Sequence, residues 1–331
     1  MKPKVFVTRN IPGEGLDLLR KTCEVRVAPQ KGVIPRKELL KGVAWADAVL
    51  SLLTDKIDKE VFDANPKLKI VSNYAVGFDN IDVGEATKHG VMVTNTPGVL
   101  TESVAEHAIA LMMALGKRIT EADAFVKTGK YKGWDPELLL GVEFDGKTAG
   151  VIGVGRIGTF FVRFAKALNM KIVYADVNRS PDIEQKYGAQ FMDLDTLLKQ
   201  SDVISLHVPL LPTTRHLINA DKLRLMKKTA ILINTSRGPV VDEKALVAAL
   251  KKGTIGGAGL DVYEFEPKPV PGLTKLKNVV LTPHTASATN EARNEMSILA
   301  AKNILAALAG EAPPALVNKE VLQQGWKRTG A

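Results

Sequence analysis

The stretch TAGVIGVGRIG, residues 148–158, decides the fold of this chain. An apolar run leads into Gly153, Gly155 and Gly158 at the spacing G-x-G-x-x-G, and the helical pattern TFFVRFAKALN follows directly. In a strand–turn–helix context one glycine permits the tight turn, one lets the backbone approach a pyrophosphate, and one allows close helix–strand packing. The helix start offers free N–H groups and a positive dipole end to phosphates. The stretch therefore predicts a dinucleotide-binding βαβ unit.

An acidic residue stands where such a unit would contact the adenosine ribose. The next apolar run, KIVYAD, ends in Asp176, 18 residues after Gly158. A carboxylate there accepts hydrogen bonds from the ribose hydroxyls of NAD and repels the 2′-phosphate of NADP. Asp176 thus favours NAD, while Arg179, three residues later, keeps NADP possible. The structural alternative is that Asp176 only caps the turn at the end of the strand.

Short apolar runs alternate with helical patterns on both sides of this unit. The upstream runs are KVFVT, CEVRVA, AVLSLL, KIVSNYA and VMVTN, and the downstream runs are DVISLHVP, AILINTSRG, GGAGLDVY and NVVLTPH. Runs of Val and Ile without polar alternation are typical of parallel strands buried on both faces. A long amphipathic stretch, Thr101 to Thr128, separates the two series, and Ser103 or Thr101 is expected to cap its start. Two doubly wound α/β units are the predicted fold.

Length and composition place the chain among ordinary globular proteins. The 331 residues predict roughly two domains, and 45% of them are hydrophobic and 24% charged. The one cysteine, Cys23, excludes an intrachain disulfide and a Cys-rich zinc site, so we expect no metal and a reducing, cytoplasmic location. The longest apolar run, residues 108–115, is far shorter than the ~20 residues of a membrane span.

The net charge of +9 raises the question of nucleic-acid binding. The basic pairs are spread along the chain near expected helix ends, where they complement helix dipoles as readily as phosphates. Aromatic residues make up only 5% of the chain, and no stretch interleaves them with basic residues. Solvated basic faces are the better interpretation, and no nucleic-acid partner is expected.

Polar residues follow three of the downstream strands. Arg237 comes after AILI, Glu266 soon after GAGLDVY, and His284 directly after VVL. Ligands of open parallel sheets bind outside the carboxyl ends of the strands, so the three side chains can share one cleft. Spacing alone does not establish that they meet. A lone histidine is more often structural than catalytic, so the interpretation of His284 depends on this convergence.

Two other histidines, His89 in a turn pattern and His107 in a helical pattern, are interpreted as structural. His207, in SLHVP, lies near the expected edge of the cofactor site. Packing or a cofactor contact is expected of His207 rather than catalysis.

Six segments, in order along nearly the whole chain, resemble the D-isomer-specific 2-hydroxyacid dehydrogenases, most closely the glyoxylate/hydroxypyruvate reductases. They are NYAVGFDNIDV, VTNTPGVLTESVAEHAIALMMAL, GVGRIG, ILINTSRGPVVDEKALVAAL, GAGLDVYEFEP and NVVLTPH. The resemblance implies NAD(P)H-dependent reduction of a small 2-keto acid, glyoxylate or hydroxypyruvate, to the D-2-hydroxy acid. It also implies a Rossmann cofactor domain, residues 101–285, inserted into a flavodoxin-like substrate domain made of residues 1–100 and 286–331. Closure about the two crossings would exclude water from the cleft.

The resemblance also implies roles for individual residues. Arg237, Glu266 and His284 match the catalytic arginine, acid and histidine, and the backbone N–H groups at Val76 and Gly77 match the loop that holds the substrate carboxylate. The positions that line the cofactor are Thr101, Arg156, Ile157, Asp176, Pro209, Thr235 and Asp261, beside the glycines, His207, His284 and Ala286. The family usually has Ile-Gly-Ser after the histidine, whereas this chain has Thr285-Ala286-Ser287. The methyl group of Ala286 lies close to the expected nicotinamide position, so an altered substrate fit is expected.

Hydride transfer to C2 of a keto acid develops negative charge on the carbonyl oxygen, which a protonated His284 can neutralise as general acid. Glu266 would hold the imidazolium, and the fork of Arg237 fits carboxylate and carbonyl oxygens together. A D-lactate or other D-2-hydroxyacid dehydrogenase of the same family, acting on pyruvate or a bulkier keto acid, is the alternative that Leu53, Trp134 and Ala286 would decide. A more distant alternative is a dinucleotide-sensing, corepressor-like binding protein, which the absence of a long disordered extension disfavours.

A homodimer is expected, because the apolar helix from Thr101 and the arm YKGWDPELLLGVEF, residues 131–144, expose more apolar surface than one domain covers. The resemblance suggests that Trp134 reaches the active site of the partner subunit.

Overall fold

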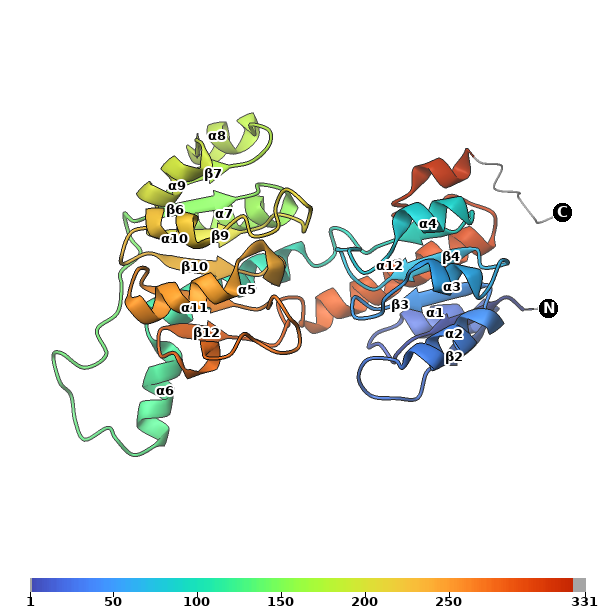
Figure 1. The fold of residues 1–331 in the computed structure, drawn as a ribbon, viewed down its shortest axis with the longest axis horizontal. Coiled ribbons are helices and arrows are strands. Elements are labelled where there is room, and N and C mark those ends of the chain that lie inside the picture. Colours follow the sequence, from blue (N-terminus) through green and yellow to red (C-terminus); the bar gives the residue numbers. More distant parts are fainter. Residues whose placement is uncertain (1, 324–331) are drawn as a thin grey trace. The chain divides into compact units, whose positions relative to one another are not determined.

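The computed structural model describes residues 2–323 and divides into two compact units. Unit 1 contains the described residues up to Leu100 and those from Ala288 onward, and unit 2 contains Thr101–Ser287. Residues 324–331, the end of the expected substrate domain, lie outside the described residues. Each unit is built on one parallel sheet (Figure 1), which confirms the predicted α/β class.

Unit 1 holds a five-stranded sheet in the order β2-β1-β3-β4-β5. Its strands are β1 (Lys4–Val7), β2 (Glu24–Val27), β3 (Ala48–Ser51), β4 (Ile70–Asn73) and β5 (Met92–Thr94). Its helices are α1 (Gly15–Thr22), α2 (Arg36–Trp45), α3 (Lys59–Asp63), α4 (Val83–Lys88) and α12 (Asn290–Leu308), with the short 3₁₀ turn η3 (Lys319–Leu322). Strands β3, β4 and β5 are buried along their whole length, including the polar Ser72 and Asn73 of β4. Burial on both faces is typical of parallel strands.

The last long helix of the chain, α12, completes this first sheet. It packs beside α1 and against β3, β4 and β5, while α2, α3 and α4 cover the opposite face. The Ser72 hydroxyl donates to the Ala300 carbonyl (3.1 Å), and the Gly15 N–H donates to the Ser297 hydroxyl (3.0 Å). A Cβ on Gly15 would lie 2.1 Å from the Ser297 carbonyl oxygen, so only glycine allows α1 and α12 to approach this closely.

Unit 2 holds a seven-stranded parallel sheet in the order β12-β11-β10-β9-β6-β7-β8. Its strands are β6 (Thr148–Ile152), β7 (Lys171–Ala175), β8 (Gln190–Phe191), β9 (Val203–Leu206), β10 (Ile231–Asn234), β11 (Gly257–Leu260) and β12 (Val279–Leu281). The strand order reverses between β6 and β9. In doubly wound sheets such a reversal opens a crevice at the carboxyl ends of the strands, where ligands bind.

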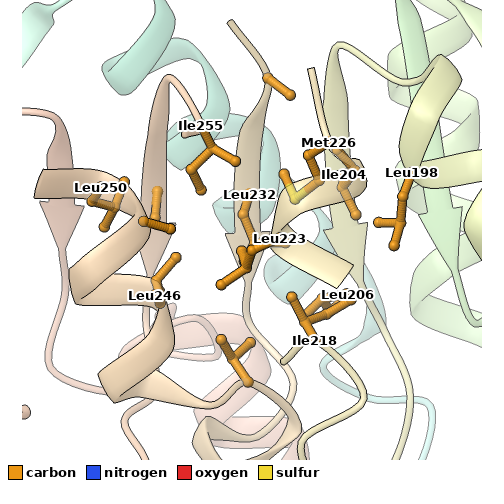
Figure 2. Close-up of a cluster of buried hydrophobic side chains, with 14 of the residues drawn as sticks. Leu198, Ile204, Leu206, Ile218, Leu223, Met226, Leu232, Leu246, Leu250 and Ile255 are labelled. Carbon is orange, nitrogen blue, oxygen red and sulfur yellow. The ribbon is translucent and has the colours of Figure 1, made fainter. Parts of the chain in front are cut away.

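Helices cover both faces of this second sheet. They are α5 (Thr101–Gly116), α6 (Ile119–Lys127), α7 (Arg156–Ala167), α8 (Pro181–Tyr187), α9 (Leu194–Gln200), α10 (Ala220–Leu225) and α11 (Glu243–Lys252), with the 3₁₀ turns η1 (Gly238–Val240) and η2 (Leu273–Lys275). Helices α5 and α7 bury one face, and α9, α10 and α11 bury the other. Figure 2 shows Leu223 of α10 and Leu246 of α11 directed toward Leu232 of β10.

The expected single helical stretch from Thr101 to Thr128 is wrong. It is divided into α5 and α6, because Arg118 between them has a left-handed backbone (φ 54°). Gly116 is the last residue of α5, and a Cβ there would lie 2.2 Å from the ring of Phe144. Packing of this ring therefore requires glycine, which also weakens the helix. The Ser103 hydroxyl is not the cap either, since it donates to the Ala286 carbonyl (2.8 Å).

Across residues 2–323, no helix is both long enough and apolar enough to cross a bilayer.

Candidate active site

The glycine turn after β6 has the geometry that a dinucleotide requires. Gly153 has φ +88°, and a Cβ there would lie 2.9 Å from the backbone of His207. A Cβ on Gly158 would lie 2.0 Å from the Gly153 carbonyl oxygen, so packing of α7 on the turn excludes any side chain. Gly155 precedes the first turn of α7, and a Cβ there would meet no atom within 4 Å. The space before Gly155 and the helix N-terminus is therefore free for a ligand.

Asp176 ends β7 beside this turn and is part of its structure. One carboxylate oxygen accepts the Val154 N–H (2.7 Å), and the other accepts the N–H of Val177 (2.6 Å). Asp176 therefore does cap the turn at the end of the strand. A carboxylate offers about four lone-pair sites, so these two bonds leave acceptors for ribose hydroxyls. Asp176 joins the glycine turn to the end of β7.

Arg179, which kept NADP possible, is engaged by a helix. Its guanidinium donates to both oxygens of Glu184 in α8, at 3.1 and 2.7 Å. Hydrogen bonding and charge attraction by Glu184 raise the pKa of Arg179. Tyr174 donates to the same carboxylate (2.5 Å) and accepts the Ser180 N–H (2.8 Å). Arg179 must leave this arrangement to contact a 2′-phosphate.

His207 lies at the end of β9, against the glycine turn. Its Nε2 is 2.8 Å from the Ser205 hydroxyl, and its ring packs on Phe161. Burial lowers the pKa of His207 to about 3, so the ring is neutral at any physiological pH. A neutral imidazole cannot deliver a proton as the cationic acid, which agrees with the expected packing or cofactor contact.

The loop after β10 carries Thr235 and Arg237. The Asn234 side chain shapes it by accepting the Ser236 N–H (3.0 Å) and donating to the Arg237 carbonyl (3.0 Å). The Thr235 hydroxyl is buried and has no hydrogen-bond partner among the described residues. Buried polar atoms are rarely unpaired in folded proteins, so this hydroxyl fits a bound ligand. Together with the open space at Gly155, it satisfies what a dinucleotide site requires.

The loops after β11 and β12 bring Glu266 and His284 together. Nδ1 of His284 lies 3.0 Å from Oε2 of Glu266, and Oε1 of Glu266 accepts the Tyr263 N–H (3.1 Å). His284 has a left-handed backbone (φ 56°), and its N–H donates to the Asp261 carbonyl (2.9 Å). Such a conformation is uncommon outside glycine and recurs at functional sites. Because Nδ1 faces the carboxylate, Nε2 is the nitrogen that remains for a substrate.

Arg237 lies on the neighbouring strand end and is half-buried, with Nη1 donating to the Ser236 carbonyl (2.9 Å). A Cβ on Gly238 would lie 1.9 Å from the carbonyl carbon of Tyr263. The arginine loop therefore packs directly on the backbone of the loop that carries Glu266. All three predicted catalytic residues follow adjacent strands, β10, β11 and β12.

Asp261, fully buried, holds the segment after His284. Its oxygens accept the Thr285 N–H (2.8 Å), the Ala286 N–H (2.8 Å) and the Thr282 hydroxyl (2.6 Å). Burial alone would raise the pKa of Asp261, but hydrogen bonds from His107, Thr282 and the two backbone N–H groups bring it below its usual value. Asp261 is thus an ionised anchor for the histidine loop.

His107, predicted to be structural, supports this anchor from α5. Its Nε2 lies 2.9 Å from the Thr282 hydroxyl and 3.5 Å from Asp261. Thr282 and Tyr263 were not predicted from the sequence. Tyr263 donates to the Thr282 carbonyl (2.9 Å), and burial followed by the charges of Asp261, Glu243 and Glu266 raises its pKa to about 12. The sequence indicates Thr282 and Tyr263 only through their places in the segments LTPH and GLDVYEFEP.

The remaining predicted site residues lie in loops or at helix starts. Leu53 follows β3, and Val76 and Gly77 follow β4, all in unit 1. In unit 2, Thr101 begins α5, Arg156 and Ile157 begin α7, Pro209 follows β9 and Trp134 lies between α6 and β6. Trp134 is 83% exposed. No group of three or more His, Cys, Asp or Glu side chains arranged to bind a metal occurs in residues 2–323.

Comparison with known proteins agrees with this geometry. The family described as "D-isomer specific 2-hydroxyacid dehydrogenase, NAD binding domain" matches residues 109–286. A glyoxylate reductase of Thermococcus litoralis is 54% identical over 326 residues, 97% of this chain and 98% of that protein. A crystal structure of a Thermus thermophilus protein has a TM-score of 0.90 and 43% identity, covering 95% of this chain and 99% of that one.

A third relative carries a cofactor in its name. It is an NADPH-dependent glyoxylate/hydroxypyruvate reductase of Sinorhizobium meliloti, solved with NADP and malonate, with a TM-score of 0.84 and 33% identity over 96% of this chain and 97% of that one. The family match covers more than half of the chain, and the Thermococcus relative matches it almost from end to end. The chain belongs to the D-isomer-specific 2-hydroxyacid dehydrogenase family.

Proposed function

We propose that this protein reduces glyoxylate or hydroxypyruvate to the corresponding D-2-hydroxy acid with NADH. The observation that carries the proposal is the pair of His284 and Glu266, 3.0 Å apart at the carboxyl edge of a sheet that also presents a dinucleotide-type glycine turn. The curated relatives at 50% identity or more bear the name glyoxylate reductase, which supports the substrate class.

His284 supplies the proton. Bound NADH would supply the hydride to C2 of the keto acid. The carbonyl oxygen then gains negative charge, and the imidazolium of His284 donates its Nε2 proton to that oxygen. Glu266 holds Nδ1, so it fixes the orientation of the ring and leaves Nε2 for the substrate.

Arg237 binds the substrate through its planar fork. Two parallel N–H donors fit a carboxylate oxygen and the adjacent carbonyl oxygen of a 2-keto acid together. The family resemblance supports three further assignments. The backbone N–H groups at Val76 and Gly77 are proposed to take the carboxylate, and Leu53, together with Trp134 of the partner subunit, is proposed to bound the substituent on C2.

The dinucleotide is proposed to lie along the carboxyl edge of unit 2. The glycine turn and first turn of α7 would hold the pyrophosphate, Asp176 the adenosine ribose, and Thr235, Asp261 and Ala286 the nicotinamide end. The unpaired Thr235 hydroxyl and the open space at Gly155 support this placement. The further cofactor contacts are assigned to Thr101, Arg156, Ile157, His207 and Pro209.

Steady-state kinetics with glyoxylate, hydroxypyruvate and pyruvate test the function, each with NADH and with NADPH. We expect kcat/KM for NADH to exceed that for NADPH by about tenfold, because the Asp176 carboxylate repels a 2′-phosphate. Engagement of Arg179 by Glu184 acts in the same direction.

The variant Glu184→Gln tests the part of Arg179 in cofactor choice, since it weakens the pairing of Arg179 and leaves Asp176 unchanged. It should lower the ratio of kcat/KM for NADH to kcat/KM for NADPH. If kcat/KM of the parent chain for NADPH equals or exceeds that for NADH, Arg179 rather than Asp176 determines binding at the adenosine ribose. Pyruvate as the best substrate would make the protein a lactate-type dehydrogenase instead.

Replacing Glu266 by Gln should lower kcat/KM for glyoxylate. In the parent chain one carboxylate oxygen accepts the Tyr263 N–H and the other faces Nδ1 of His284. The amide places an NH2 group where one of these acceptors was, so one of the two contacts is lost together with the negative charge. The imidazole ring is then held less firmly, and kcat/KM should fall by roughly 10–10²-fold, the size of effect expected from a misplaced catalytic group.

The exposed variant Asp221→Asn, at the start of α10, serves as control and should leave kcat/KM nearly unchanged. An unchanged kcat/KM in Glu266→Gln would mean that the carboxylate does not position the catalytic histidine.

We also propose a homodimer formed through unit 2. Helix α6 buries none of its residues, and it extends with the following segment away from the sheet (Figure 1). Large apolar side chains are exposed there: Ile119 55%, Val126 59%, Tyr131 52%, Trp134 83% and Leu140 66%. Contiguous apolar surface of this kind marks protein interfaces.

Light scattering at micromolar protein should give twice the chain mass of 35.8 kDa. The variant Leu140→Glu should lower that mass at the same concentration, since it places a charge in the apolar surface. A parent protein that scatters as a single chain contradicts the dimer.

A further inference from the structure

A buried carboxylate that the proposed mechanism does not use lies at the first residue of α11. Glu243 is only 2% exposed. Burying a charged side chain is costly unless hydrogen bonds or opposite charges compensate it. The N-terminus of α11, a helix of ten residues, compensates part of that cost. The rest must come from specific partners.

Those partners are two backbone N–H groups of one loop. Oε2 of Glu243 accepts the Glu264 N–H at 2.6 Å, and Oε1 accepts the Val270 N–H at 2.7 Å. The two donors bracket Glu266, which lies two residues after the first and four before the second. We call this arrangement, the Glu243 carboxylate with the N–H groups of Glu264 and Val270, the loop clamp.

Charged and titratable groups surround the loop clamp on the side of Glu264. Oε2 of Glu264 accepts the Glu243 N–H (3.2 Å), which makes the bonding between the two residues reciprocal. Oε1 of Glu264 lies 2.7 Å from Nε2 of His216 and 3.5 Å from the guanidinium of Arg215. Tyr263 is the other titratable neighbour, and the charge of Glu243 contributes to its raised pKa.

The loop clamp joins two parts of the proposed active site. Arg237, η1 and Glu243 follow one another closely along the chain, so the carboxylate is tethered to the loop that carries the arginine. On the other side, Tyr263 next to the clamp donates its N–H to Glu266. A change at Glu243 therefore reaches Glu266 through one short, hydrogen-bonded loop.

We infer that Glu243 is a positioning residue that, through the loop clamp, places Glu266 where its carboxylate reaches Nδ1 of His284. The expected effect on kcat/KM rests on the proposed function. The expected effect on the loop rests on the hydrogen bonds alone. Glu243 itself contacts neither His284 nor the expected substrate position.

The test uses Glu243→Gln, which keeps the shape but leaves one oxygen to accept two N–H groups. We expect kcat/KM for glyoxylate to fall by roughly 10–10²-fold, because small misplacements of catalytic groups have effects of that size. Glu264→Gln keeps the backbone N–H of the loop clamp and weakens only the bond from the Glu243 N–H to the Glu264 side chain, so it should give a smaller loss of the same kind.

The matched control is Asp242→Ala. Asp242 caps the same helix by accepting the Ala245 N–H (3.0 Å) but has no bond to the loop. Its loss should lower the melting temperature while leaving kcat/KM for glyoxylate nearly unchanged. A general weakening of α11 is thereby separated from the positioning of Glu266.

The double variant Glu243→Gln/Glu266→Gln decides between coupled and independent action. If Glu243 acts through Glu266, the double variant has about the same kcat/KM as Glu266→Gln alone. The inference is overturned if the losses in kcat/KM of the two single variants multiply in the double variant. It is also overturned if Glu243→Gln and Asp242→Ala have the same kcat/KM.

Amide hydrogen exchange gives a readout that needs no activity. Exchange in residues 261–272 should accelerate by about tenfold in Glu243→Gln and stay unchanged in Asp242→Ala, since a hydrogen bond to a charged group is lost only in the first. Equal exchange in the two variants also contradicts the loop clamp. If the parent chain reduces no keto acid, the proposed function fails, and exchange alone still decides on the clamp.

Discussion

Replacing His284 by Ala is expected to lower kcat/KM for glyoxylate by about 10²–10⁴ at every pH, the usual contribution of a general acid. The alanine variant has no group to protonate the carbonyl oxygen, so the loss should not recover in acid. The structure supplies no second cationic donor from β9, because burial lowers the pKa of His207 to about 3. The measurement is kcat/KM for glyoxylate against pH with saturating NADH.

The control for this variant is His89→Asn, in unit 1, where the ring pairs with Asp63 at 3.0 Å. Its kcat/KM should stay within about twofold of the parent value, the size of effect typical of surface changes. Retention of more than a tenth of the parent rate by His284→Ala would return that histidine to a structural role.

Replacing Arg237 by Lys should lower kcat/KM by roughly 10²–10³, the range seen when one donor to a developing oxyanion is removed. Lysine keeps the positive charge but presents a single point donor, whereas the substrate offers two oxygens side by side. The loss should appear in kcat as well as in KM for the keto acid, because one of those oxygens gains charge only during the reaction.

Arg179→Lys, assayed with NADH, is the control. Arg179 pairs with Glu184 on the surface of α8, and its replacement should leave glyoxylate kinetics nearly unchanged. A normal kcat in Arg237→Lys would show that charge alone suffices at this position.

The parallel sheets were predictable because their signals are local. Runs such as AILI and VVL between turn residues are typical of parallel strands in an α/β chain, and β10 and β12 coincide with them. The glycine turn was equally predictable, since Gly158 packs on the Gly153 carbonyl within the same βαβ unit and Gly153 has a left-handed backbone (φ +88°).

Features that depend on distant residues were not predictable from the sequence. The break between α5 and α6 is set partly by Phe144, whose ring occupies the place of a side chain at Gly116. The helical pattern of apolar residues over 101–128 does not indicate that contact. The double role of Asp176, as a support of the glycine turn and a candidate ribose ligand, depends in the same way on the Val154 N–H.

The candidate catalytic pair shows the same limit. Glu266 and His284 stand in recognisable segments, but their 3.0 Å approach depends on a left-handed residue and on Asp261, which holds the following backbone. Glu243 lies in the quoted segment VVDEKALVAAL, and nothing in that segment indicates that its carboxylate is buried against residues 264–270.

The return of α12 to the first sheet has a consequence for synthesis on the ribosome. Strands β1 to β5 emerge first, but the face that α12 covers over β3, β4 and β5 stays bare until residues 290–308 have been translated. Unit 2 is one continuous segment, complete at Ser287, and has all its strands before that helix exists. The first sheet is therefore completed only after unit 2, and its apolar face depends on protection of the nascent chain until α12 has been translated.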